Sequence, residues 1–271
     1  MPKPVTVTYS IWPTPEGVAL AAARLFSDAA IHAVTTRGIA RIAISGGNTP
    51  KAMFTLLADP TQPFLDEVDW SKLQLFWVDE RCVPPTDPES NFGMTEQVLL
   101  AKIPLPSENI FRMEGELDPE VAASRYETIL RNTMKLEGAE SPAFDLVLLG
   151  MGDDGHTASL FPHTDAINEL GRLVVANHVP QKDTWRITLT SPVINQAREV
   201  VFLVEGEAKS IVLAEVLTGA QDPERLPSQL VRPSNGKLRF LLDEAAADNL
   251  PDPSNTLTAT GGSHRVGTLE L

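Results

Sequence analysis

The sequence has a single cysteine, Cys82, among its 271 residues. One cysteine can form neither an internal disulfide nor a thiolate zinc site, so disulfide-built extracellular scaffolds are excluded. Long apolar runs are also missing: FDLVLLG and EVVFLVEG have the length of strands, whereas a membrane span needs about 18 or more apolar residues. The segment MPKPVTVTYSIWPTPEG lacks the pattern of a signal peptide. We therefore expect a soluble protein of the cytoplasm.

Basic residues are scarce as well. Lysine and arginine number 22 against 36 aspartates and glutamates, which gives a formal net charge of −14. Such a chain repels nucleic acid and anionic membranes, so we expect neither as a partner. An anionic ligand would need a local group of basic residues. Apolar residues make up 42% of the chain, enough to bury a core, and this excludes a disordered protein.

Short β-branched apolar runs alternate with helical patterns along most of the chain. Strands are predicted at 5–9, 39–44, 73–78, 144–149, 173–176, 186–190, 200–204 and 238–242. Helices are predicted at 15–36, 50–58, 91–101, 119–136, 208–217 and 243–247. Nearly all-apolar strands that alternate with helices predict an α/β fold with a doubly wound, mainly parallel, Rossmann-like sheet. We expect one domain, residues 1–247, followed by a loosely ordered tail, 248–271, rich in polar residues and glycine.

Ligands of parallel sheets bind at the carboxyl ends of the strands, so the residues after each strand carry functional information. After the second predicted strand comes Ser45-Gly46-Gly47, and Thr49 then opens a helix. Glycines let a ligand approach the backbone, and a helix N-terminus offers unpaired N–H groups and a positive dipole. This turn suits a phosphate, although an ordinary strand-to-helix turn has the same composition.

Three charged residues, Asp79, Glu80 and Arg81, follow the third predicted strand. Charges at that position either face the ligand crevice or belong to a solvated loop. Cys82 comes next. Because no Cys/His motif surrounds Cys82, we interpret it as a packing residue rather than a nucleophile.

The fourth predicted strand ends in GMGDDG at 150–155, which matches the dinucleotide pattern G-x-G-x-x-G. We reject a dinucleotide site, because Asp153 and Asp154 would repel a pyrophosphate and no long helical pattern follows. His156 fits a different role. A carboxylate such as Asp154 can orient an imidazole and stabilise its protonated form, so His156 is a candidate general base, with a structural histidine as the alternative.

Two basic residues, Arg186 and Lys209, could supply the positive charge that a phosphate needs in this acidic chain. Each could equally form a surface ion pair worth about 0–1 kcal/mol. The motifs of serine esterases, P-loop proteins, zincins and EF-hands are absent, and no metal-ligand spacing occurs around His163 or His178. We therefore expect neither a metal nor a cofactor.

Four blocks resemble the glucosamine-6-phosphate isomerase/6-phosphogluconolactonase family, in the family's order. They are SGGNTP at 45–50, WVDERCVPPTDPESN at 77–91, LLGMGDDGHTASLFP at 148–162 and RITLT at 186–190, and VRPSNGKLRFLLDEAAA at 231–247 resembles the closing strand and helix. The family shares its fold group with the deaminases and ribose-5-phosphate isomerase-like proteins. Deaminases typically have DEY and DGHIAFNEP, whereas here Arg81 follows Asp-Glu and Thr157 follows His156, which resembles the lactonase branch.

The resemblance implies hydrolysis of 6-phospho-D-glucono-1,5-lactone to 6-phosphogluconate, the second step of the oxidative pentose phosphate pathway. It implies that His156 activates water, that Arg81 stabilises the oxyanion, and that Asp79 and Asp154 orient the base and the sugar hydroxyls. The implied phosphate ligands are Ser45, Gly46, Gly47, Thr49, Arg186 and Lys209.

The implied partner is a small sugar-phosphate lactone, bound by a monomer or a homodimer without a cofactor. Two alternatives share the fold: an amino-sugar-phosphate deaminase or isomerase, and a non-catalytic sugar-phosphate sensor. A sensor of this kind would carry a DNA-binding segment, and no basic helix-turn-helix pattern is visible in the sequence.

Overall fold

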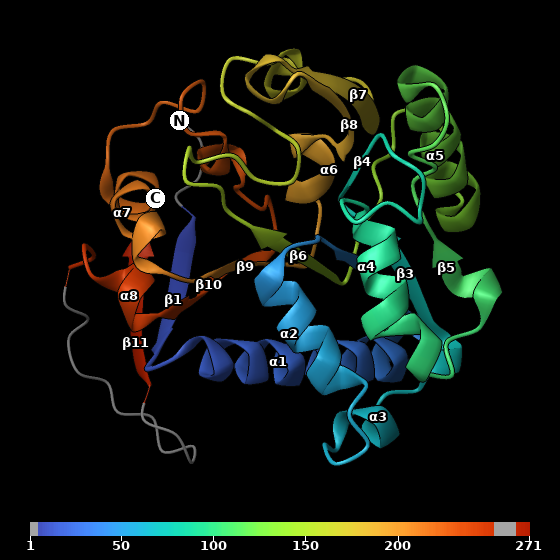
Figure 1. Cartoon of the computed structure of the whole chain (residues 1–271), viewed down its shortest axis with the longest axis horizontal. Coiled ribbons are helices and arrows are strands. Elements are labelled where there is room, and N and C mark those ends of the chain that lie inside the picture. The colour runs from blue at the N-terminus through green and yellow to red at the C-terminus, as the bar shows by residue number, and fades with distance from the viewer. Residues whose placement is uncertain (1–4, 252–263) are drawn as a thin grey trace.

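The computed structural model describes residues 5–251 and 264–271 (Figure 1). Its main sheet has the strand order β11-β1-β10-β9-β6-β2-β3-β5, and a smaller sheet has the order β4-β8-β7. The main strands are β1 (Thr6–Trp12), β2 (Ala40–Ile44), β3 (Leu73–Trp77), β5 (Ile110–Phe111), β6 (Leu146–Gly150), β9 (Glu199–Val204), β10 (Lys237–Asp243) and β11 (Arg265–Glu270). Neighbouring main strands are parallel except for β1 and β11.

Helices cover both faces of the main sheet. One face carries α1 (Pro15–Arg37), α2 (Asn48–Leu57), α3 (Phe64–Glu67) and α4 (Asn91–Val98), and the other carries α5 (Pro119–Met134), α6 (Ser191–Asn195), α7 (Ser210–Thr218) and α8 (Glu244–Ala247). Successive strand residues face opposite sides: Leu148 packs with the first group of helices, and Leu149 with the second. The predicted doubly wound α/β sheet is confirmed.

The helix α1 shows how local sequence builds this cover. The Thr14 side chain accepts a hydrogen bond from the Gly17 N–H, Pro15 occupies the first helical position, and Gly38 ends the helix with a φ of 79°. By length and composition, α1 is the one helix in the described residues that could cross a membrane. Its buried face, centred on Phe26, instead packs in the core against the main sheet.

The small sheet corrects one expectation. The segments predicted at 173–176 and 186–190 do not join the parallel sheet: β7 (Val174–Val179) and β8 (Thr184–Leu189) form an antiparallel hairpin, with β4 (Asp79–Arg81) as the third strand. A parallel crossover needs about a dozen or more residues. Only residues 180–183 separate β7 from β8. This connection is too short for parallel pairing of the two strands, so they pair as an antiparallel hairpin.

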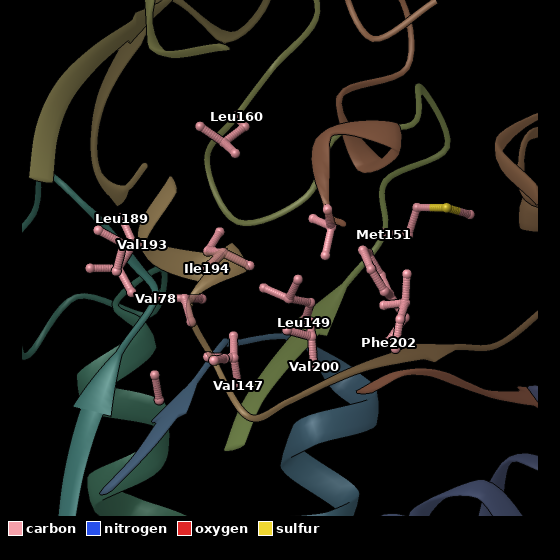
Figure 2. Packing of buried hydrophobic residues seen from close by; sticks show 14 of the residues in the cluster. Val78, Val147, Leu149, Met151, Leu160, Leu189, Val193, Ile194, Val200 and Phe202 are labelled. Atoms are coloured by element: carbon pink, nitrogen blue, oxygen red, sulfur yellow. The ribbon is translucent and has the colours of Figure 1, made fainter. Parts of the chain in front are cut away.

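A hydrophobic cluster joins the two sheets (Figure 2). Leu149 of β6 and Phe202 of β9 extend from the main sheet, and Leu189 of β8 comes from the small one. Ile194 of α6 packs in the same cluster, and all four side chains are fully buried. Burying such a side chain contributes about 1.5–3 kcal/mol, so this core fixes the small sheet near the carboxyl ends of the main strands.

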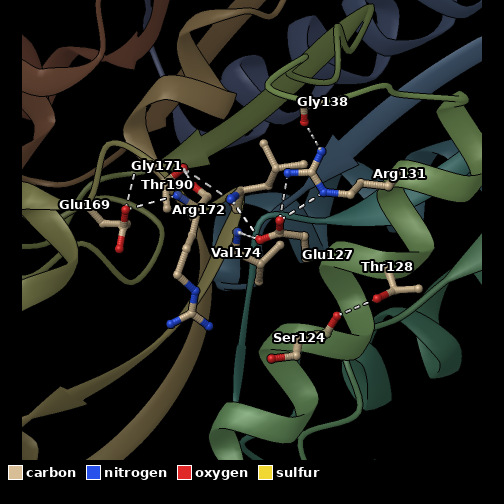
Figure 3. Close-up of polar contacts among 11 residues, drawn as sticks. Ser124, Glu127, Thr128, Arg131, Gly138, Glu169, Gly171, Arg172, Val174 and Thr190 are labelled. Atoms are coloured by element: carbon tan, nitrogen blue, oxygen red, sulfur yellow. Dashed lines mark hydrogen bonds and ion pairs between the residues drawn. The ribbon is translucent and has the colours of Figure 1, made fainter.

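Polar contacts from α5 also hold the small sheet (Figure 3). Oε2 of Glu127 accepts hydrogen bonds from the backbone N–H groups of Leu173 (3.0 Å) and Val174 (3.4 Å), where β7 begins. Oε1 of Glu127 pairs with Arg131 at 2.9 Å, which orients the carboxylate. The start of β7 is thereby tied to α5 by backbone groups that the sheet itself leaves unpaired.

The C-terminal residues correct a second expectation. The tail predicted at 248–271 is not loosely ordered at its end, because β11 pairs antiparallel with β1 and places Gly267 opposite Tyr9. Residues 252–263 lie outside the described residues. The side chains of β11 are half-buried or exposed, as in an edge strand, so its sequence lacks the apolar run that marks the central strands.

Gly267 provides a test of this strand. A Cβ at Gly267 would lie 2.1 Å from Cζ of Tyr9, inside the space of the ring. Gly267→Val should therefore displace β11 and lower the free energy of unfolding by about 1–3 kcal/mol, measured by denaturant titration. Thr268→Ala, at an exposed neighbouring position, is the control and should change that free energy by less than about 0.5 kcal/mol. Equal stability of both variants would contradict the packing of β11.

Candidate active site

A cleft of about 500 Å³ opens where the connections of the main sheet change direction. From the centre of the sheet, β2 leads to β3 on one side and β6 is followed by β9 on the other, and such a switch point leaves a crevice at the carboxyl ends. The cleft is lined by residues that follow these four strands, among them Ser45, Gly46, Gly47, Thr49, Asp79, Arg81, Gly150, Gly152, Asp153, His156, Glu205 and Lys209. A larger hollow of about 880 Å³ lies at the amino ends of β1 and β10, and its described lining contains no histidine or carboxylate.

His156 and Asp154 form a close pair after β6. Nδ1 of His156 lies 2.5 Å from Oδ1 of Asp154, and the His156 backbone N–H donates to the same oxygen at 3.1 Å. Burial would raise the pKa of Asp154, but the hydrogen bonds and charge of His156 outweigh it and lower the pKa to about 2. With an ionised carboxylate at Nδ1, Nε2 is the nitrogen that remains to accept a proton. The ring also stacks on Phe161, with centroids 4.0 Å apart.

Gly152 makes room for this pair. A Cβ at Gly152 would lie 2.0 Å from Nδ1 of His156 and 2.5 Å from Oδ1 of Asp154. The Gly152 N–H donates to the His156 carbonyl at 2.8 Å, which closes the turn, and Gly155 adopts a φ of 78° that favours glycine. The glycines of GMGDDG thus shape a turn around the histidine.

Asp79 connects three loops at the base of the cleft. Its side chain is buried: Oδ2 accepts from the Ser159 hydroxyl at 2.7 Å, and Oδ1 accepts from Nδ2 of Asn91 at 3.3 Å. Asn91 in turn packs against Gly46, where a Cβ would lie only 1.9 Å from Oδ1 of Asn91. The loops after β2, β3 and β6 are therefore mutually fixed. Asn91 was not predicted as a site residue, although it is the last residue of the block at 77–91.

Arg81 lies in the cleft on a loop held by Glu80. Nη1 of Arg81 donates to the Glu89 carbonyl at 2.5 Å. Glu80 is 2% exposed and accepts hydrogen bonds from the backbone N–H groups of Arg81 and of the first two residues of α4. Burial raises the pKa of Glu80, and these donors oppose that effect. Glu80 thus caps α4 and fixes the backbone that carries Arg81.

Arg186 is a predicted phosphate ligand that does not line the cleft. It is buried, sits opposite Arg81 in the β4–β8 pairing, and donates through Nη1 to the Thr184 hydroxyl at 3.0 Å. Burial, followed by the charge of Arg81, lowers the pKa of Arg186. Cys82 is half-buried beside them, and burial raises the pKa of its thiol to about 11, which opposes the thiolate that a nucleophile requires.

The turn after β2 presents the N-terminus of α2 to the cleft. Gly47, with φ 113°, occupies the N-cap and has no side chain to cap the first turn, which leaves N–H groups for an anion. The two predicted hydroxyl ligands are engaged within the protein: Ser45 donates to the Leu148 carbonyl at 3.0 Å, and Thr49 donates to Oε2 of Glu205 at 2.6 Å. At this turn itself, backbone N–H groups are thus the available anion-binding groups, and Lys209 adds a positive charge in the same cleft.

Three charged residues that line the cleft were not predicted as site residues: Asp153, Lys182 and Glu205. Lys182 lies in the turn that connects β7 to β8, and its Nζ is 5.6 Å from the centroid of the Phe161 ring. Both strands were predicted to lie in the main sheet, so the sequence did not indicate that this turn reaches the cleft. Glu205 directly follows β9, the same positional signal that singled out Asp79. In the part of the chain that the structure describes, no group of three or more His, Cys, Asp or Glu side chains is arranged to hold a metal ion.

Known proteins resemble the chain over most of its length. The model of the Glucosamine-6-phosphate isomerases/6-phosphogluconolactonase family matches residues 13–240. The chain belongs to this family. A 6-phosphogluconolactonase of Synechocystis sp. is 44% identical over 220 residues, which cover 80% of this chain and 88% of that protein. The predictions of this family and of an enzyme are confirmed.

Solved structures of the family agree with the fold. A 6-phosphogluconolactonase from Trypanosoma cruzi matches with a TM-score of 0.78 and 32% identity, over 92% of this chain and 98% of that one. A monomeric glucosamine-6-phosphate deaminase matches with a TM-score of 0.73 over 90% of this chain and 99% of that one. Its identity of 19% shows a shared fold alone.

Proposed function

We propose that the protein hydrolyses 6-phospho-D-glucono-1,5-lactone to 6-phosphogluconate, as the second step of the oxidative pentose phosphate pathway in the cytoplasm. The main support is the His156–Asp154 pair, which shares one cleft with Arg81 and the N-terminus of α2. The names of the relatives supply the substrate class. A base, a cation for an oxyanion and an anion-binding helix end are the groups that hydrolysis of a phosphorylated lactone requires.

The proposed reaction uses His156 twice. Nε2 of His156 removes a proton from water as the water oxygen attacks C1 of the lactone. The guanidinium of Arg81 stabilises the oxyanion that forms on the carbonyl oxygen. When the bond between C1 and the ring oxygen breaks, the imidazolium returns the proton to that oxygen, and the open-chain acid leaves. Asp154 keeps the ring oriented through Nδ1 and stabilises its positive charge.

The substrate would be oriented by its phosphate, which we place at the N-terminus of α2. The 6-phosphate would lie on the backbone of Gly46, Gly47 and Thr49 at the N-terminus of α2, with the ammonium group of Lys209 alongside. Arg186 lies opposite Arg81 in the β4–β8 pairing and is absent from the cleft lining, so the proposal gives it no direct contact with the phosphate. Asp79 keeps the loops in register, and its carboxylate at the base of the cleft is available to the sugar hydroxyls.

A pH-stat assay with freshly generated lactone tests the proposal. Purified protein should release acid well above the spontaneous rate, and it should release no ammonia from glucosamine 6-phosphate. Arg81 stands where the deaminase branch typically has tyrosine, so ammonia release comparable to the lactonase rate would replace the proposed reaction by deamination. Binding of the sugar phosphate without either reaction would instead identify a sensor.

A further inference from the structure

Glu205 is a carboxylate at a place where an anion is expected to bind. It follows β9 directly and lines the cleft together with Gly47, Thr49 and Lys209. Its Oε2 accepts the hydrogen bond from the Thr49 hydroxyl, at the first turn of α2. Its Oε1 is buried and has no hydrogen-bond partner among the described residues. Oε2 of Glu205 thus has a hydrogen-bond donor in the Thr49 hydroxyl, while Oε1 has none among the described residues.

The surroundings of Glu205 disfavour its ionised form. Asp243 is buried and accepts a hydrogen bond from the N–H of Gly206, the residue after Glu205. Burial, together with the charges of Asp243 and of Glu16 at the start of α1, raises the pKa of Glu205, and the Thr49 hydrogen bond opposes this. Lys209 lines the same cleft but forms no ion pair with Glu205 within the described residues.

A phosphoryl group would add negative charge to this environment. The other titratable groups that line the cleft are Asp79 and Asp153, which repel an anion, Arg81 and Lys182, which attract one, and His156, which is paired with Asp154. A phosphate at the N-terminus of α2 would approach Glu205, because Thr49 belongs to that turn and touches Glu205 directly. Two adjacent anions cannot both stay charged without a large cost, so a proton must enter.

We propose that Glu205 determines specificity for the phosphorylated substrate as a neutral carboxylic acid, donating a proton from Oε1 to a phosphoryl oxygen. This inference rests on the proposed function, because it assumes that the 6-phosphate lies at the N-terminus of α2. Binding of the phosphorylated ligand then takes up a proton from solution, and affinity falls as pH rises. A ligand without the phosphate offers no acceptor and takes up no proton at this site.

The alternative is that Glu205 stays ionised and only orients the Thr49 hydroxyl. That role needs no proton uptake. In that role Glu205→Gln would remove the repulsion between Glu205 and the phosphate, but it would also leave a weaker acceptor for the Thr49 hydroxyl. The affinity of this variant alone therefore does not identify the role. The two roles thus differ in whether binding of the phosphorylated ligand takes up a proton.

Calorimetric titration of the intact protein separates the two roles. The reaction product 6-phosphogluconate is the probe, and gluconate, which lacks the phosphate, is its control. At pH 8, titrations in two buffers with different ionisation enthalpies should show uptake of about one proton with 6-phosphogluconate and none with gluconate. Glu205→Gln supplies a permanent N–H donor, so it should abolish the uptake and bind 6-phosphogluconate about 10-fold more tightly than wild type at pH 8.

Glu207→Gln is the matched control, because Glu207 is exposed, lies two residues further and makes the same change in net charge. It should bind and take up protons like wild type. Absence of proton uptake by the wild-type protein would overturn the inference even if Glu205→Gln failed to fold. Lactonase activity is measured on the wild-type preparation used for calorimetry. If this protein is active but takes up no proton, only the role of Glu205 is contradicted. If it is inactive, the proposed function itself is contradicted.

Discussion

Replacing His156 by glutamine is expected to lower kcat by about 10²–10⁴-fold with little change in KM. General-base catalysis contributes an effect of this size, and an amide cannot take the proton from water. The reason lies in the geometry: Asp154 occupies Nδ1 at 2.5 Å, so Nε2 of His156 is the one basic atom that the pair presents to water.

Single-turnover rates and a thermal melt, measured on the same His156→Gln preparation, distinguish a general base from a structural histidine. His163→Gln is the control, since the His163 side chain is 65% exposed in the same loop and does not line the cleft. A structural role for His156 predicts a lower Tm, with KM and kcat altered together. A well-folded His156→Gln protein that kept more than about a tenth of wild-type kcat would rule out the general base, because His156 would then supply less than about 1.4 kcal/mol.

The central strands were predictable because burial on both faces imposes apolar residues at most positions. Residues 146–149 of β6 are all fully buried, and an uninterrupted apolar run of this kind marks a strand of a parallel sheet. The edge strand β11 has no such constraint, since half of its side chains face solvent and its pairing partner β1 is far away in sequence. The hairpin of β7 and β8 was recognised as strands, but sequence patterns do not state which sheet a strand joins.

The candidate site was predictable to the extent that it depends on position along the chain. His156, Arg81 and Thr49 follow strands, and parallel strands bring their carboxyl ends to one edge. What the sequence could not provide is how each polar group is already used. The hydroxyls of Ser45 and Thr49 donate within the protein, because the groups that accept from them come from β6 and from the loop after β9. Such pairings depend on strand order, which no local pattern encodes.

Gly152→Ala is expected to reduce kcat by about 10²-fold or more, because the added methyl group would occupy the space of the His156–Asp154 pair. Its Cβ would lie 2.0 Å from Nδ1 of His156, a distance at which the ring must move. The hydrogen bond between the two side chains would break, and the imidazole would lose its orientation toward the substrate. The turn after β2, where we propose that the phosphate binds, is not touched, so KM for the phosphorylated lactone should change far less than kcat.

Gly150→Ala is the matched control for this prediction. Gly150 lies two residues earlier and lines the same cleft, yet a Cβ there meets nothing within 4 Å. Its φ lies outside the left-handed region, so alanine is compatible with the backbone. Gly150→Ala should therefore retain kcat within a few-fold of wild type, and thermal melts should show both variants folded. Equal loss of activity in the two variants would mean that the cleft tolerates no added bulk anywhere. Selective loss in Gly152→Ala would tie catalysis to the geometry of the His156–Asp154 pair itself.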